Sequence, residues 1–188
     1  MEPTRPTLSC RCQLVPSCCT LVRVPLTHRD LKRLATSTGH PSSHFVEWLA
    51  PDEVDMSGEP ETFVEVDLGR RLMVLRHERG ACLSLTNEGW CGTYEARPAP
   101  CAAYPYAFDE PRPLTSGVRR LFVLGDAPCA HAMPGRDDES ARAAVQCVEV
   151  ELNEYVRLVS EWNRQQLRRR FAGHRPRSAA EFLAYLSP

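Results

Sequence analysis

Nine cysteines in a chain of 188 residues constrain this protein more than any other feature of its sequence. Eight of them lie in the first 129 residues, and seven of those fall into two groups. The eight are Cys10, Cys12, Cys18 and Cys19, then Cys82, Cys91 and Cys101, and finally Cys129. So many thiols are used either in a disulfide framework or in a metal site. The choice between the two decides what holds this part of the fold together.

Disulfides belong to oxidising compartments and to small domains that cannot build a hydrophobic core. The segment Met1–Leu8 carries two prolines and lacks the apolar stretch of a secretory signal, so we expect a reduced, cytoplasmic setting. The cysteine count is also odd, which would leave at least one thiol unpaired in any disulfide scheme. A metal site is therefore the favoured prediction.

The composition predicts an ordinary soluble globular protein, because 43% of the residues are hydrophobic, 25% are charged and the net charge is -1. We expect one domain over residues 1–188, with a cysteine-cluster metal-binding region at 10–129 and a helical region at 138–188 that packs on it. No stretch is apolar enough for a membrane span. The arginines near the C-terminus lack interleaved aromatic residues, so a nucleic-acid partner is not expected, and any protein partner stays unknown.

The hydrophobic pattern predicts an α+β fold, in which a small, irregular, cysteine-rich domain with short helices and a β-hairpin precedes a long C-terminal amphipathic helix. The predicted elements are a loop over Cys10–Pro25, helices over His28–Ser37 and Ser43–Leu49, a hairpin built from Phe63–Val66 and Leu72–Leu75, a strand over Leu121–Leu124, a helix from about Glu139 to Arg170, and a last helix from Ser178.

Two of the helix starts carry a capping box, in which a hydroxyl residue precedes an acid by three positions: Thr27 with Asp30, and Ser178 with Glu181. By contrast, residues 82–113 contain five prolines and few periodic apolar residues. A compact loop region of this kind needs a source of order other than a hydrophobic stripe. A bound metal would supply it.

The spacing of the thiols argues against a zinc finger, because no pair has the C-x(2 to 4)-C separation of a zinc knuckle. In an extended backbone, Cys18 and Cys19 would point to opposite sides, so they would serve two centres or one multinuclear cluster. The eight thiols named above would supply two sites of four cysteines each. A single site with spare buried thiols remains open.

The second group lies in a specific string, Cys91-Gly-Thr-Tyr94-Glu-Ala-Arg97-Pro-Ala-Pro-Cys101-Ala-Ala-Tyr104-Pro105, followed by an aromatic residue. This string resembles the YkgJ-type cysteine-cluster proteins, the zinc- or iron-chelating family named for a CxxCxxCC signature. The resemblance covers about Cys10 to Tyr106, and the first motif departs from it because Cys10, Cys12 and Cys18 are separated by one and five residues.

What the resemblance implies is metal binding through Cys18, Cys19, Cys82, Cys91 and Cys101, joined by Cys10, Cys12 and Cys129. We expect the cofactor to be iron, as one or two iron-sulfur clusters, or zinc. The alternative hypothesis is an iron-sulfur-dependent modifying enzyme related to flagellin lysine-N-methylases, for which no catalytic residue is identified.

Two further residues, Arg97 and Cys147, each have two possible roles. Arg97 would either donate hydrogen bonds to cluster sulfurs or form a salt bridge with Glu95 or Glu88. Cys147 lies in the long helix, where a half-buried hydrophobe is favoured over a ligand. The six histidines are scattered, and His131 is the one that merits a test as a ligand.

Overall fold

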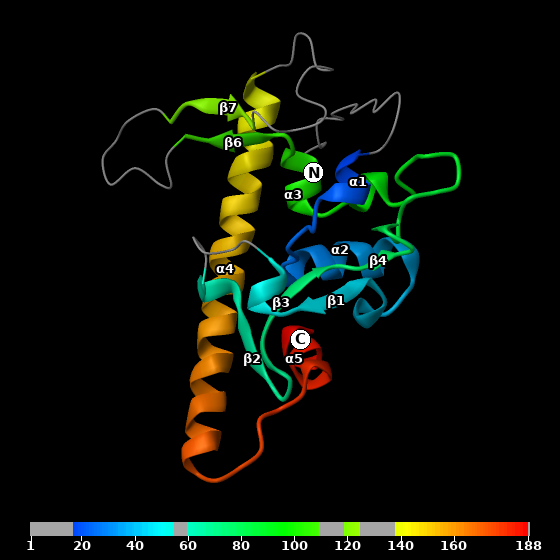
Figure 1. Ribbon diagram of the computed structural model, residues 1–188. Helices are drawn as coiled ribbons and strands as arrows, with labels where there is room; N and C mark the ends of the chain where they lie inside the picture. The colour runs from blue at the N-terminus through cyan, green and yellow to red at the C-terminus, as the bar shows by residue number, and fades with distance from the viewer. Residues whose placement is uncertain (1–16, 55–59, 110–118, 125–137, 188) are drawn as a thin grey trace.

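Helix α4 (Asp138–Phe171) is the longest element and runs along most of the molecule (Figure 1). The computed structural model describes residues 17–54, 60–109, 119–124 and 138–187. Within these ranges, short helices and three small antiparallel sheets lie beside α4. The predicted α+β class, with its short helices, hairpin and long C-terminal helix, is confirmed.

The predicted hairpin consists of β2 (Val64–Val66) and β3 (Gly69–Leu75), which pair in antiparallel register. The turn that joins them requires a left-handed backbone at Gly69, whose φ is 87°, and glycine adopts this conformation without strain. Strand β1 (Val46–Leu49) also pairs antiparallel with β3, giving the order β1-β3-β2. Strand β3 is therefore the centre of the largest described sheet.

The side chains of β3 point alternately to two buried surfaces. Met73 and Leu75 belong to the main core, which also contains Cys82, whereas Leu72 and Val74 belong to a smaller core on the other face. The chain after α1 (Ser17–Leu21) extends this sheet, because the Leu75 amide donates to the Val24 carbonyl at 2.8 Å. Residues next to α1 thus lie against the end of β3.

The helix predicted over Ser43–Leu49 is wrong. Residues Ser42–Phe45 form a short 3-10 helix, η1, and the four residues that follow form β1. The spacing of Phe45, Trp48 and Leu49 resembles that of apolar residues on one face of a helix. Val46 to Leu49 instead pair with the open edge of β3 as a strand. A distant strand partner outweighs local helical periodicity here.

Both predicted capping boxes are present. Thr27 caps α2 (His28–Thr38) and exchanges hydrogen bonds with Asp30, and Gly39 ends the helix in a left-handed conformation. Ser178 caps α5 (Ala179–Leu186) in the same way with Glu181. Both ends of α2 and the start of α5 match the prediction to within one residue, because local side chains fix them.

Helix α4 is fastened to β2 by side chains from its second half. The Trp162 indole N–H donates to the Glu65 carbonyl at 2.8 Å, and Asn163 accepts from the Glu65 amide at 2.8 Å and donates to the Phe63 carbonyl at 2.9 Å. The Trp162 ring also meets the edge of Phe182 in α5, at a centroid distance of 5.1 Å. The predicted long helix is confirmed, and its apolar side packs on the sheet.

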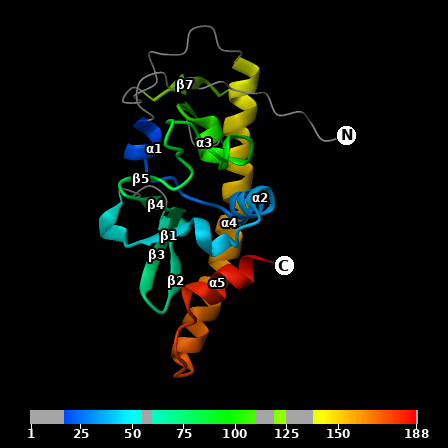
Figure 2. The ribbon, with the colours of Figure 1, turned by 90° about the vertical axis from the view of Figure 1, so that its right-hand side faces the viewer.

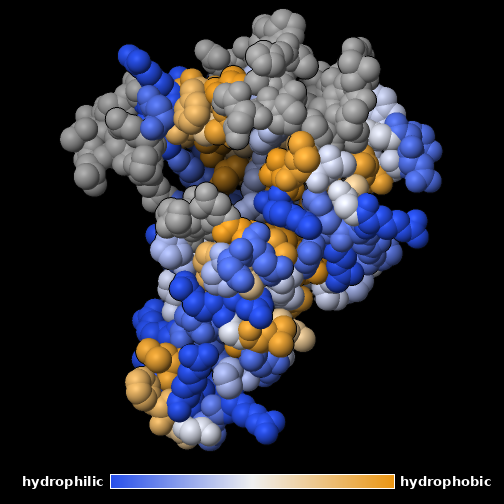
Figure 3. Space-filling view, in the orientation of Figure 1, coloured by the Kyte–Doolittle hydropathy of each residue, from blue (hydrophilic) through white to orange (hydrophobic). Residues whose placement is uncertain are grey.

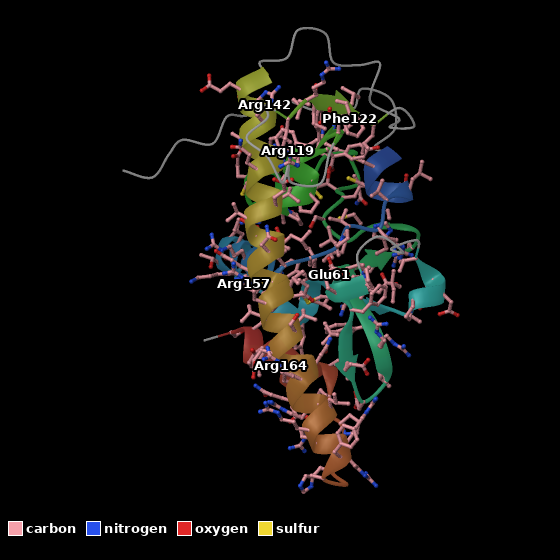
Figure 4. The ribbon with its side chains drawn as sticks, turned by 90° about the vertical axis from the view of Figure 1, so that its left-hand side faces the viewer. Glu61, Arg119, Phe122, Arg142, Arg157 and Arg164 are labelled. Atoms are coloured by element: carbon pink, nitrogen blue, oxygen red, sulfur yellow. The ribbon has the colours of Figure 1, made fainter. Side chains whose placement is uncertain are left out.

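The first half of α4 is held by a different set of contacts. The Arg119 guanidinium pairs with Glu149, and Arg142 donates to the Arg119 carbonyl at 2.6 Å. Figure 4 shows Arg119 and Arg142 together at this end of α4, with Arg157 and Arg164 further along the helix. These contacts join α4 to the residues just before β7 (Leu121–Val123). Strand β7 pairs with β6 (Tyr106–Phe108), so the strand predicted over Leu121–Leu124 is confirmed.

The far end of α4 is strongly basic. Its last turn carries Arg168, Arg169 and Arg170, all exposed, and Figure 3 shows hydrophilic surface interrupted by hydrophobic patches at this end of the molecule. Positive charge at a helix C-terminus is stabilised by the helix dipole. Of the helices in the described ranges, none combines the length and the apolarity that crossing a membrane requires.

Candidate metal centre

Five of the eight predicted ligands lie in the described residues, and four separate segments supply them. Cys18 and Cys19 are on α1, Cys82 is in β5 (Ala81–Cys82), Cys91 follows a tight loop, and Cys101 is on α3 (Ala99–Ala103). Both Figures 1 and 2 show α1 beside α3. Cys10, Cys12 and Cys129 lie outside the described residues, as does His131.

Cys18 and Cys19 are close neighbours in space. The predicted loop over Cys10–Pro25 is wrong for residues 17–21, which form α1. Successive side chains on a helix diverge by about 100° instead of pointing to opposite sides. Their Sγ atoms are 4.0 Å apart. The expectation that these two side chains point to opposite sides is therefore wrong, and both thiols can face one centre.

The tight loop before Cys91 brings it back toward Cys82. The Thr86 amide donates to the Trp90 carbonyl at 2.8 Å, and Leu85 and Cys91 form an isolated β-bridge. The Gly92 amide donates to the Ser84 carbonyl at 2.7 Å, and a Cβ on Gly92 would lie 3.3 Å from that same oxygen. Only a residue without a side chain fits this approach comfortably.

Asp30 anchors the helix that carries Cys101. Its carboxylate is fully buried and accepts from the Ala99 amide, at the start of α3, at 2.7 Å. It also accepts from the Thr27 amide and hydroxyl, both at 2.8 Å. Arg33 pairs with Asp30 and with Glu151 of α4, so one charged network ties α2, α3 and α4 together.

The thiols affect one another electrostatically. Burial raises the pKa of Cys101 well above its ordinary value, and the charges of Cys82, Cys91 and Cys18 raise it further. Burial, followed by Cys91 and Cys18, raises the pKa of Cys82. A hydrogen bond with Cys18, burial and the charges of Cys18, Cys82 and Cys91 raise the pKa of Cys19. Protonated thiols are therefore the stable form of the metal-free site.

The chemistry of this donor set suits a soft or borderline metal ion. Thiolates are the preferred ligands of zinc and of iron-sulfur clusters, and a cation removes the repulsion that raises these pKa values. Within the described ranges, no three His, Cys, Asp or Glu side chains are already arranged as a metal site. The five thiols are thus gathered in one region, and a bound ion would have to draw them closer.

Two other predicted positions have identified contacts. The Arg97 guanidinium lies 3.9 Å from the centroid of the Tyr94 ring and donates to the Tyr94 carbonyl at 2.8 Å, an arrangement that neither sequence reading anticipated. Cys147 is half-buried on α4, and its Sγ lies 3.4 Å from Glu151 Oε1. Its contact is with the charged network that ends at Asp30.

His77, in β4 (His77–Glu78), is a site candidate that the sequence analysis passed over. It is the register partner of Cys82 in the β4–β5 pair. Its Nε2 atom is buried and has no hydrogen-bond partner among the described residues. Burial, and then the charge of Arg23, lower the pKa of His77, so the ring is neutral at pH 7. No spacing motif in the sequence could have identified it.

Comparison with known proteins agrees with the cysteine pattern. Searches of curated proteins and of solved structures found no match to the chain. One family model matches residues 10–148, and its description is CxxCxxCC, "Putative zinc- or iron-chelating domain". The match spans most of the chain and takes in all eight predicted ligands. This protein therefore belongs to the CxxCxxCC family of zinc- or iron-chelating domains.

Proposed function

We propose that this protein binds iron, as an iron-sulfur cluster, or zinc, through clustered cysteine thiolates in a reduced, cytoplasmic setting. The ligands would be Cys18, Cys19, Cys82, Cys91 and Cys101, together with Cys10, Cys12 and Cys129. The observation that carries this proposal is the proximity of thiols from four segments of the chain: the charges of Cys18 and Cys91 act on Cys82, and those of Cys18, Cys82 and Cys91 act on Cys101.

The chain's own part in binding is to collect the thiols and to give up their protons. Burial keeps Cys19, Cys82 and Cys101 protonated without metal, so binding releases protons, and affinity rises with pH. The bound ion would supply the positive charge that a group of thiolates needs. It would also supply order to residues 82–109, because the free energy of binding is free energy of folding in such a site.

Iron is preferred over zinc because several thiols without knuckle spacing suit a multinuclear cluster. Eight ligands would serve one or two clusters. An iron-sulfur-dependent modifying activity remains the alternative, and failure to bind S-adenosylmethionine in calorimetry would exclude the form of it that uses this cofactor.

Serine variants test the ligand set. In protein purified without oxygen, Cys91→Ser and Cys101→Ser should each lower the bound metal at least tenfold and weaken the broad visible absorbance of an iron-sulfur cluster. Cys147→Ser is the matched control, because Cys147 is also half-buried but contacts Glu151. Equal losses in all three variants would contradict the ligand assignment. A colourless protein with stoichiometric zinc would overturn the preference for iron.

A further inference from the structure

A histidine nitrogen is buried without a partner beside the cysteine site. Of the ring atoms of His77, Nε2 is buried and has no hydrogen-bond partner among the described residues, and the ring lies beside the Val22 backbone. A neutral imidazole can carry its lone pair on Nε2, and that is the atom a metal would bind.

The register of the strands directs this ring toward the thiols. His77 and Cys82 are opposite each other in an antiparallel pair, so their side chains lie on the same face, with Cβ atoms about 4.5–5.5 Å apart. Along the chain, His77 also continues the alternation of Met73 and Leu75, which face the main core. Cys82 belongs to that core.

The same core surface gathers the other sulfur ligands. Cys19 and Cys101 are half-buried against it, and so is Val22, whose backbone lies beside the His77 ring. The charges of Cys18 and Cys91 act on Cys82. The face that His77 shares with Cys82 is therefore the face on which the thiols meet.

We propose that His77 Nε2 is a nitrogen ligand of the metal bound by these cysteines, which makes the centre a mixed sulfur and nitrogen site. A buried nitrogen without a partner is otherwise costly, and a metal would satisfy it. This inference rests on the proposed metal-binding function and adds a ligand to it.

The experiment uses Co²⁺ and Zn²⁺ as probes of the full chain, reduced and free of metal. We expect His77→Ala and His77→Gln to weaken Zn²⁺ binding at least tenfold in competition with a chelator and to change the visible spectrum of the Co²⁺ complex. Nitrogen NMR of the wild type should show a large shift of His77 Nε2 on Zn²⁺ binding, which a merely structural histidine would not give.

His28→Gln is the matched control. His28 is also half-buried, burial lowers its pKa as well, and one of its ring nitrogens is likewise without a partner, but it lies beside Glu154 of α4. This variant should bind both metals as the wild type does. Thermal unfolding of the metal-free proteins provides a second readout, because an unfolding temperature close to that of the wild type shows that a loss of metal affinity in His77→Gln does not come from loss of the fold.

The possible results distinguish the His77 ligand from the proposed metal-binding function on which it rests. Wild type that binds neither probe and contains no iron when purified without oxygen overturns both. Wild type that binds neither probe but contains iron overturns the histidine ligand alone if His77→Gln retains that iron. Wild type that binds, with unchanged affinity and spectrum in His77→Gln, overturns the histidine ligand alone. Loss of affinity that is equal in His77→Gln and His28→Gln, without an Nε2 shift, also contradicts it.

Discussion

Single residues at this site are defined by their protonation as much as by their position. Cys101, Cys82 and Cys19 all have pKa values above the ordinary 9.0, and the charges of neighbouring thiols contribute to each shift. A buried thiol of this kind favours the folded state below its unfolded pKa. That contribution is lost as the pH rises through the folded pKa, because the unfolded chain ionises first.

Metal-free, reduced protein should therefore lose stability progressively as the pH rises above about 9, near the ordinary thiol pKa. Each thiol that stays protonated in the folded state contributes a slope of about 1.4 kcal/mol per pH unit. The urea midpoint measured at several pH values checks this expectation, and Cys101→Ser should show a shallower decline than the wild type. An equally steep decline in that variant would contradict the role given to burial of Cys101.

Some residues of the candidate site could be identified from the sequence, and others could not. The cysteines could be proposed as ligands, since their number and spacing are visible in the sequence, and that ligand set stays a prediction. His77 could not be proposed from the sequence, because its relation to Cys82 depends on the pairing of two very short strands. The contact of Arg97 with Tyr94 depends on a turn whose shape the sequence does not reveal.

Among the elements, α2 and α3 are joined by one carboxylate. Asp30 accepts from the Ala99 amide and pairs with Arg33, which reaches Glu151 on α4. Replacing Asp30 with Asn leaves Arg33 partly uncompensated in a buried setting, and loss of one partner of such a pair costs about 3 kcal/mol or more. Helix α3, and with it Cys101, should then be held less firmly.

In Asp30→Asn we expect hydrogen exchange at the Ala99 amide to accelerate and alkylation of Cys101 to become faster, both in metal-free protein. Glu181→Gln is the control, because Glu181 completes the capping box of α5 in an exposed position away from the thiols. The control should leave Cys101 alkylation unchanged. Equal acceleration in the two variants would mean that general loosening, and not the tether to α3, sets the reactivity of Cys101.

Elements whose ends are fixed by local side chains could be predicted from sequence, as α2 and α5 show with their capping boxes. The hairpin β2–β3 and the long helix α4 also follow from clear periodicity. Strand β1 was missed because its conformation depends on the distant edge of β3. Helix α1 was missed because five residues are too few to show a period.

At the scale of the whole molecule, a helical and sheet framework presents thiols from four segments at one place. The framework has its own buried core, with Trp162 and Phe182 at one end, whereas the cysteine region lies at the end with α1 and α3 (Figures 1 and 2). We therefore expect removal of metal to loosen residues 82–109 while α4 and the sheet stay folded. The apolar core would then stabilise α4 and the sheet, and the metal would order the proline-rich loop region.

Elemental analysis of protein prepared without oxygen tests the central claim most directly. The account requires iron or zinc in at least a one-to-one ratio with the chain, and acid-labile sulfide as well if the iron is in a cluster. The metal should disappear in Cys101→Ser and persist in Cys147→Ser. Folded, fully reduced wild-type protein that contains neither metal and takes up neither when it is supplied would contradict the account.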